Sequence, residues 1–191
     1  MPSQPEIKPE TYISVDVETA GPTPEEYSML SIGACLVDDP DSGFYVELKP
    51  LTDNVQESSL AVSGLSMEAL ARDGLTPIDA MRQFEDWVEL VTPKGNVPVF
   101  VAFNAVFDWM WVDTYFHRYL KRNPFGHSAI DMKAYFMGMT GSTWAETSMR
   151  FLSPHYLAGR HLSHNALGDA RDQADLFRQV KAEAEAGHRS A

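Results

Sequence analysis

The sequence is poor in cysteine and has no long apolar run. With Cys35 as the single cysteine, an intramolecular disulfide is excluded, and its place in the apolar run Leu30–Val37 predicts a small buried thiol. Uninterrupted apolar stretches do not reach membrane length, and the N-terminus lacks the basic-then-apolar pattern of a secretory signal. We therefore expect a protein of the reducing cytoplasm that does not associate with a membrane.

Basic residues are also scarce. The 15 lysines and arginines are outnumbered by 27 acidic residues, which gives a formal net charge of −12. Proteins that bind long nucleic acids through charge normally carry a basic surface, so this balance argues against such binding. It does not exclude an enzyme that holds a short end of a strand through metal ions. The length of 191 residues, with 44% apolar and 22% charged residues, is typical of one globular domain.

Strand-forming segments dominate the first quarter of the chain. Strands are predicted over residues 11–18, from 29 to about 37 and over 44–48, and the turn-rich links between them favour an antiparallel meander. The apolar run Val97–Phe103 predicts a central strand that is covered on both faces, and a short fifth strand ends near Asp131.

Helical segments separate the later strands. A short helix over 58–64 ends at a glycine, a longer one begins at Thr76-Pro77, and another follows Asn104 as its cap. Further helices are predicted over about 133–139, 143–152 and 165–185. The pattern predicts an α/β fold with a five-stranded mixed sheet flanked by helices. We expect a single domain over residues 11–185, with flexible tails at 1–10 and 186–191.

Two carboxylates stand at the end of the first strand. Asp16 and Glu18 are two residues apart, so they share one face of the strand, and a turn signal follows at residues 19–22. Two anions on one face repel each other unless a cation neutralises them, which points to a divalent metal ion. A solvated acid pair at a strand end is the alternative interpretation.

Other acids occur in unusual surroundings. Asp108 lies in the first turn of a helix, where interaction with the helix dipole is the simplest explanation. Asp169 lies near the apolar face of the last helix and therefore needs a partner or a metal ion. His164, five residues earlier in a loop, is either a surface residue or a general base near neutral pH. We expect Asp131 to be a turn or cap residue, with a supporting role behind the metal ligands as the alternative, and Asp172 to be an acid that is solvated or faces the helix dipole.

Three of these patterns stand in the order of known exonuclease motifs: Asp16-x-Glu18, Asn104-x-x-Phe107-Asp108 and His164-x-x-x-x-Asp169. The sequence therefore resembles the DEDDh (DnaQ-like) 3′–5′ exonuclease family, whose members have the ribonuclease H-like fold. The string Asp16–Gly21 and the turn Asn123-Pro124-Phe125 are particularly similar to ribonuclease T. Ser58 and Val62 differ from the acid and the stacking aromatic expected there, which leaves the choice of substrate open.

The resemblance implies a catalytic set and two divalent cations, Mg²⁺ or Mn²⁺, which suit oxygen ligands. Asp16 would bridge the two ions, Glu18 and Asp169 would complete one site, and Asp108 would complete the other. His164 would deprotonate the attacking water. The resemblance further implies substrate contacts by Thr19, Ala20, Gly21, Asn104 and Phe107. Phe103 is the alternative to Phe107.

The implied function is 3′–5′ hydrolysis of single-stranded nucleic acid with release of nucleoside 5′-monophosphates, and the strings similar to ribonuclease T slightly favour RNA over DNA. The alternative is a catalytically weak or inactive protein-interaction module on the same fold. The charge of −12 favours this module, whereas the complete set of acids with His164 argues against it. A homodimer is plausible by resemblance to ribonuclease T, although the sequence alone does not show one.

Overall fold

The central strand of the sheet is β1 (Glu10–Thr19) in the computed structural model, which describes residues 7–160 and 163–189. Its apolar residues Ile13, Val15 and Val17 are buried, as alternating β-branched side chains in a core strand require. The strand order is β3-β2-β1-β4-β5. The predicted five-stranded mixed sheet is therefore confirmed.

Strand pairing explains why one end of β1 remains open. β1 pairs antiparallel with β2 (Met29–Leu36), and β2 pairs antiparallel with β3 (Gly43–Glu47), as the predicted meander requires. β4 (Val97–Ala102) and β5 (Ala129–Asp131) add parallel strands on the other side. β4 pairs only with the first half of β1, up to Ser14 opposite Val101. The second half of β1 therefore projects past its parallel neighbour.

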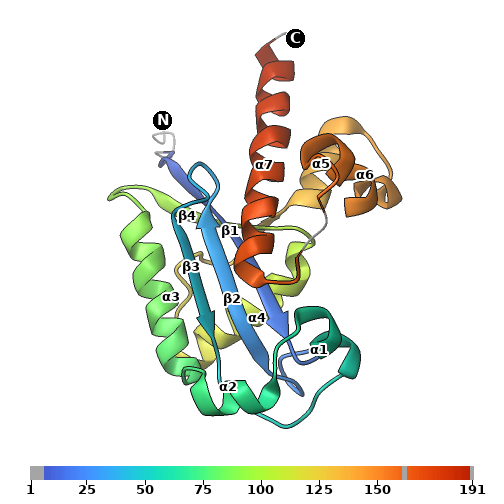
Figure 1. Cartoon of the computed structure of the whole chain (residues 1–191). Helices are drawn as coiled ribbons and strands as arrows, with labels where there is room; N and C mark the ends of the chain where they lie inside the picture. The colour runs from blue at the N-terminus through green and yellow to red at the C-terminus, as the bar shows by residue number, and fades with distance from the viewer. Residues whose placement is uncertain (1–6, 161–162, 190–191) are drawn as a thin grey trace.

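Helices cover both faces of the sheet (Figure 1). One core lies under α3 (Pro77–Val91) and α4 (Ala105–Tyr119), and Thr76 caps α3 by accepting a hydrogen bond from Asp79 N, as predicted. The other core lies under α7 (Ala166–Arg189), which is supported by α5 (Met132–Thr140) and α6 (Met149–Tyr156). Figure 1 shows α7 crossing the sheet, with its first turn near the arrowhead of β1.

Short helices surround the end of β1. α1 (Glu57–Ser63) ends at Gly64, whose φ of 67° is the left-handed conformation expected of a C-terminal glycine. α2 (Met67–Asp73) was not predicted, because its seven residues carry too short an apolar pattern to distinguish it from a loop. The single helix predicted over 143–152 is a 3₁₀ turn, η1 (Trp144–Thr147), followed by α6.

The last helix is longer than predicted. α7 continues to Arg189, because the alanines and glutamates after residue 181 are strong helix formers. At the other end, Glu10 belongs to β1 rather than to a tail, and residues 1–6 and 190–191 of the predicted tails lie outside the described residues. Among the described helices, none combines the length and apolarity needed to cross a bilayer.

Close packing fixes the first turn of α7 against β2. A Cβ atom added to Gly33 would lie 2.1 Å from both Ala166 C and Leu167 N, so only glycine permits this approach. Further along, Cys35 is buried, as predicted, and its thiol donates a hydrogen bond to Ala170 O at 3.5 Å. Burial raises the pKa of this thiol to about 12. The cysteine is a packing residue beneath α7.

We predict that Gly33→Ala destabilises the protein and displaces the start of α7. The added methyl group would overlap helix backbone, which has little freedom to yield. A drop in melting temperature is the expected result. Gly138→Ala in α5 is the matched control, because an added Cβ there meets nothing within 4 Å. Equal melting temperatures for the two variants would contradict this account of the contact.

Candidate active site

Three carboxylates meet at the open end of β1. Asp16, Glu18 and Asp169 each offer an oxygen atom, and these atoms all lie within 4.8 Å of one another. β1 supplies two of the side chains on one face, as predicted, and α7 supplies the third from above that face. The pairing of β1 with β2 shifts register between Glu18 and Thr19, an irregularity that is frequent next to active sites.

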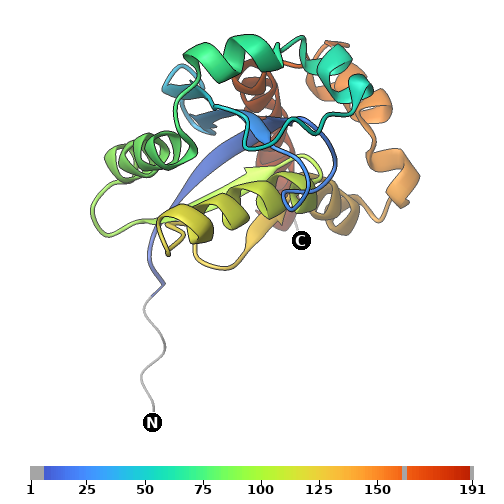
Figure 2. The same cartoon turned by 90° about the horizontal axis from the view of Figure 1, so that it is seen from below.

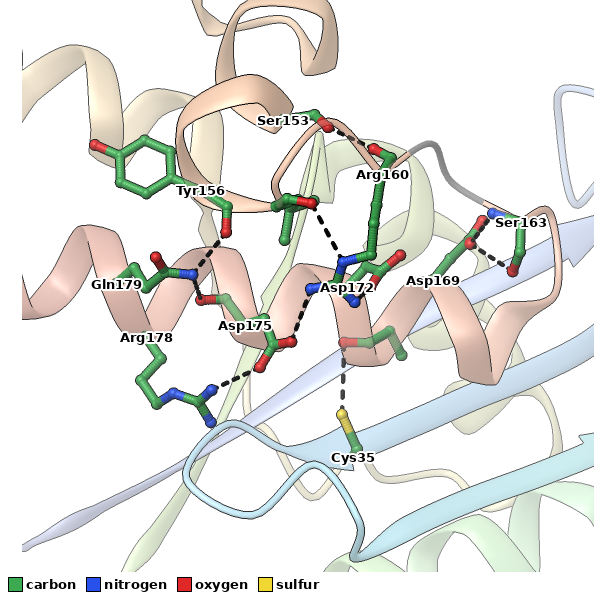
Figure 3. A network of polar contacts seen from close by, with 12 residues as sticks. Cys35, Ser153, Tyr156, Arg160, Ser163, Asp169, Asp172, Asp175, Arg178 and Gln179 are labelled. Carbon is green, nitrogen blue, oxygen red and sulfur yellow. Dashed lines mark hydrogen bonds and ion pairs between the residues drawn. The ribbon is translucent and has the colours of Figure 1, made fainter.

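Backbone amides hold Asp169 in place. One carboxylate oxygen accepts hydrogen bonds from Ser163 N at 2.6 Å and Ser163 Oγ at 3.0 Å, and the other accepts one from His164 N at 3.0 Å (Figure 3). Asp169 is only 2% exposed, so these bonds supply the partners that a buried carboxylate needs. The loop before α7 therefore orients this acid.

Gln173 connects Asp16 to the neighbouring strand. Its Nε2 donates to Asp16 Oδ1 at 2.7 Å, and its Oε1 accepts from Phe103 N at 2.9 Å, directly after β4. Gln173 is not among the site residues predicted from the sequence. A detectable signal existed, because Gln173 lies one helical turn after Asp169 and therefore projects from the same face of α7.

Asp108 reaches the site from α4 on the side that β4 leaves open. Its Oδ1 accepts a hydrogen bond from Val17 N at 3.1 Å, taking the position of a missing strand partner. The side chain is 4% exposed and lies outside the group of three oxygen atoms that Asp16, Glu18 and Asp169 form. Asp108 thus contacts the strand that carries Asp16 and Glu18, in addition to its favourable place at a helix N-terminus.

Burial, together with repulsion between carboxylates, raises the pKa values of Asp16, Glu18 and Asp108. Burial is the largest cause for Asp16, whose pKa lies well above its usual range, and repulsion from Asp108 and Glu18 follows. Burial and then repulsion from Asp169 raise the pKa of Glu18 to about 7. Burial raises the pKa of Asp108 to about 8. A set of clustered oxygen ligands that resist ionisation fits a hard divalent cation, whose charge would remove the repulsion.

His164 lies in the loop between α6 and α7. Its backbone has a φ of 56°, and its amide is bound to Asp169. The imidazole is exposed and lines a hollow of about 370 Å³ together with Arg150 and Arg160, rather than joining the three carboxylates. The structure thus places His164 beside the acids, and its role as general base stays a prediction.

Arg160 ties the same loop to α7 (Figure 3). It forms ion pairs with Asp172 and, at 3.1 Å, with Asp175, which also pairs with Arg178 at 2.6 Å. Only 14% of the Asp172 side chain is exposed, so the prediction of a solvated acid is wrong for this residue. Arg160 covers the Asp172 side chain and pairs with its charge. This arginine comes from another segment, so the spacing of residues along α7 does not reveal the contact.

The predicted substrate residues after Glu18 are buried in the turn that closes β1. Thr19 donates its hydroxyl to Gly21 O at 2.8 Å. Ala20 N donates to Ser28 O at 2.8 Å, and Ala20 O accepts from Gln56 N at 2.8 Å. A Cβ atom on Gly21 would lie 2.3 Å from the Tyr27 ring. These residues hold the turn in place, and their contact with a substrate stays a prediction.

Asn104 occupies the cap position of α4, but the prediction that it caps the helix is wrong for its side chain. Its φ is 64°, and within the described chain the side chain accepts no capping hydrogen bond. Asp131 does so instead, accepting from Ala105 N at 2.6 Å through one oxygen and from Ala134 N at 2.8 Å through the other. The prediction of Asp131 as a cap residue is confirmed, for two helices at once.

Phe107 lines a hollow beside Glu18. This hollow measures about 300 Å³ and brings together residues of β1, α1 and α4: Val17, Glu18, Thr19, Ser58, Ser59, Val62 and Phe107. The phenyl ring is half-buried and lies 6.4 Å from the Trp111 ring, between centroids. α1 therefore stands next to Glu18.

A family model described as "Exonuclease" matches residues 13–177. The chain belongs to the exonuclease family. The 3′–5′ DNA exonuclease Cap18 of Escherichia coli is 44% identical over 171 residues, which cover 90% of this chain and 91% of that relative. The predicted family and the prediction of a 3′–5′ exonuclease enzyme are confirmed.

Solved structures confirm the predicted ribonuclease H-like fold. The complex of E. coli exonuclease I with single-stranded DNA has a TM-score of 0.69 at 20% identity, covering 92% of this chain and 41% of that one. The nuclease domain of 3′hExo, a DEDDh family member bound to rAMP, has a TM-score of 0.69 at 10% identity and covers 92% of both chains. This exonuclease chain thus spans less than half of exonuclease I and nearly all of the 3′hExo nuclease domain.

We predict that Gln173→Leu lowers activity by roughly 10–100-fold, as is typical when a partner of a metal ligand is removed. The variant leaves Asp16 Oδ1 and Phe103 N without their bond to the amide. Steady-state hydrolysis at increasing Mg²⁺ concentration measures the effect, and part of the loss should be recovered at high Mg²⁺. Gln179→Leu, further along α7, is the matched control. Wild-type activity and metal dependence in Gln173→Leu would refute a role in orienting Asp16.

We also predict that the metal-free protein loses stability as pH rises from about 5 to 8. The pKa of Glu18 is about 7 in the folded protein, above the ordinary 4.5. Protonated Glu18 therefore contributes its full stabilisation of the folded state below pH 4.5, and this contribution is lost as the pH rises through 7. Melting temperatures in EDTA measure the trend, and Glu18→Gln should weaken it. Mg²⁺ should restore stability most strongly at pH 8. A melting temperature that rises across this range would contradict the prediction.

Proposed function

We propose that this exonuclease removes nucleotides from the 3′ end of single-stranded DNA with the aid of two divalent cations, Mg²⁺ or Mn²⁺. The observation that carries the proposal is the convergence of Asp16, Glu18 and Asp169 within 4.8 Å, with Asp108 buried beside them. The products are nucleoside 5′-monophosphates. A tight group of carboxylates has no evident structural use, because its members destabilise one another when ionised.

The cations would be held by Asp16, Glu18 and Asp169, with Asp108 completing the second position. When bound, two divalent cations supply charge neutralisation at the phosphate and lower the pKa of an attacking water. Gln173 keeps the Asp16 carboxylate oriented through its Nε2. The His164 imidazole accepts the proton of the attacking water, while its amide remains bound to Asp169.

The hollow beside Glu18 is the proposed place for the terminal nucleotide. Phe107 provides an aromatic surface there, and Thr19 with Ser58 and Ser59 provides hydroxyl groups. Its volume of about 300 Å³ is at the lower end of the range for small-molecule sites, which suits one nucleotide unit better than a duplex end. The opening onto the carboxylates would bring the scissile phosphate next to the acids.

DNA is the proposed substrate because the relative that shares 44% identity over most of both chains is a DNA exonuclease. The sequence strings similar to ribonuclease T favour RNA, and that preference stays a prediction. A protein-interaction module remains the second candidate, for which the charge of −12 is the one favourable observation.

We predict that wild-type protein shortens 5′-labelled single-stranded DNA from its 3′ end in Mg²⁺ or Mn²⁺ but not in EDTA. Asp16→Asn should lower the activity by more than roughly 100-fold, the largest loss that is typical when a hydrogen-bond partner of a metal ligand is removed. Asp41→Asn, an exposed residue in the turn between β2 and β3, is the matched control for charge. Matched RNA oligonucleotides in the same assay measure the sugar preference.

Three outcomes would overturn parts of this proposal. Full turnover by folded Asp16→Asn protein would sink the metal assignment. Faster hydrolysis of RNA than of DNA would reverse the proposed substrate. No shortening of either strand by folded protein, with no Mg²⁺-dependent rise in melting temperature, would favour the protein-interaction module.

A further inference from the structure

An aromatic and basic group lies at the carboxyl edge of the sheet, outside the acidic site. Lys133 Nζ, in the first turn of α5, is 4.1 Å from the centroid of the Trp144 ring and 5.7 Å from that of Phe103. No carboxylate oxygen of the described residues lies within 4.0 Å of this ammonium group. Its charge is therefore available to an anion in a chain of net charge −12.

Trp144 is 51% exposed, although its segment is firmly held. The Thr143 backbone amide and hydroxyl both donate to Glu146 Oε2 at 2.7 Å, and Thr147, which is fully buried, donates its hydroxyl to Trp144 O at 2.7 Å. The 3₁₀ turn thus fixes the backbone of a large aromatic residue while leaving half of its surface open to solvent. An exposed, positioned indole is a typical platform for stacking.

This group is connected to the catalytic acids. Phe103 N binds Gln173, and Gln173 binds Asp16, so Phe103 stands one side chain away from the acid site. Phe103 packs in the core under α7, whereas Phe107 of the hollow packs in the core on the opposite face. Figure 2 views the molecule from the end toward which β1 points. The acid site is thus connected to Phe103 on one face of the sheet and to Phe107 on the other.

We infer that Lys133, Trp144 and Phe103 form a subsite for a nucleotide on the 5′ side of the scissile bond. The base stacks on Trp144, and the Lys133 ammonium pairs with a phosphate of the strand. This inference rests on the proposed function, which places the 3′-terminal nucleotide in the hollow beside Glu18. Stacking accepts every base, so the subsite gives affinity for single strands without a sequence preference.

A positive charge in this subsite would favour binding of the substrate. The clustered carboxylates repel an approaching phosphate backbone, and the screening length of about 8 Å at physiological salt confines that repulsion to phosphates close to the carboxylates. Lys133, which lies beside Phe103, would offset part of that repulsion without a basic surface elsewhere. The effect of its charge should weaken as salt rises, whereas stacking on Trp144 should depend little on salt.

Hydrolysis of two substrates tests the inference: a single-stranded DNA oligonucleotide and the p-nitrophenyl ester of thymidine 5′-monophosphate, which has no nucleotide 5′ of the scissile bond. Trp144→Ala should lower kcat/KM on the oligonucleotide by about 5- to 150-fold, the factor that corresponds to loss of one stacked base. It should leave hydrolysis of the ester unchanged. Trp144→Phe, which retains an aromatic surface, should keep most of the activity on the oligonucleotide.

Lys133→Ala should also reduce activity on the oligonucleotide only, with a deficit that shrinks as salt rises. Lys94→Ala is the matched control, because this exposed lysine precedes β4 at the opposite edge of the sheet. Wild-type kcat/KM on the oligonucleotide in both Trp144→Ala and Lys133→Ala would overturn the subsite while the proposed function stands. An equal loss on both substrates would also overturn it, since that pattern indicates damage to the acid site. Wild-type protein that hydrolyses neither substrate would overturn both.

Discussion

Mutual repulsion among four carboxylates is the constraint on which the structure around the site depends. Asp16, Glu18 and Asp169 lie within 4.8 Å of one another, and Asp108 is buried beside the same strand. Burial removes the water that would screen them, so the pKa values of Asp16, Glu18 and Asp108 rise. The fold must therefore hold these side chains where their own electrostatics would separate them.

Backbone amides and one carboxamide provide that restraint. Val17 N binds Asp108, the amides of Ser163 and His164 bind Asp169, and Gln173 binds Asp16. Amide donors orient a carboxylate without adding a competing positive charge. A lysine or arginine in place of these amides would neutralise the negative charge of the carboxylates and lower their affinity for a metal cation. The arginine of this region, Arg160, pairs instead with Asp172 and Asp175 further along α7, where it anchors the loop that carries His164.

The sequence was sufficient for the features that local periodicity determines. The two-residue repeat of a strand placed Asp16 and Glu18 on one face, and the helical repeat placed Asp169 on the buried side of α7. It did not predict contacts that depend on where strands end. Asp108 binds Val17 because β4 stops pairing at Ser14 of β1, and this register is a property of the assembled sheet.

The same limit explains the errors at the helix caps and at Asp172. Asn104 has the residue type and position of a capping residue, but Asp131 comes from the adjacent strand and takes the amide at the start of α4. Asp172 has the spacing of an exposed helix position, but Arg160 covers it from the preceding loop. Both residues were assigned from neighbours in sequence, whereas the deciding contacts, Asp131 with Ala105 and Arg160 with Asp172, span 26 and 12 residues of the chain.

Net charge is a poor guide to substrate for such a site. Charges separated by more than about 8 Å in physiological salt are largely screened, so most of the 27 acidic residues have little influence at the carboxyl edge of the sheet. The electrostatic potential at the 3′ end of a bound nucleic acid is determined by the clustered carboxylates, by the cations proposed to bind them and by Lys133 in the proposed subsite. A chain with a charge of −12 is therefore compatible with a nucleic-acid substrate, provided that it binds a short end rather than a long backbone.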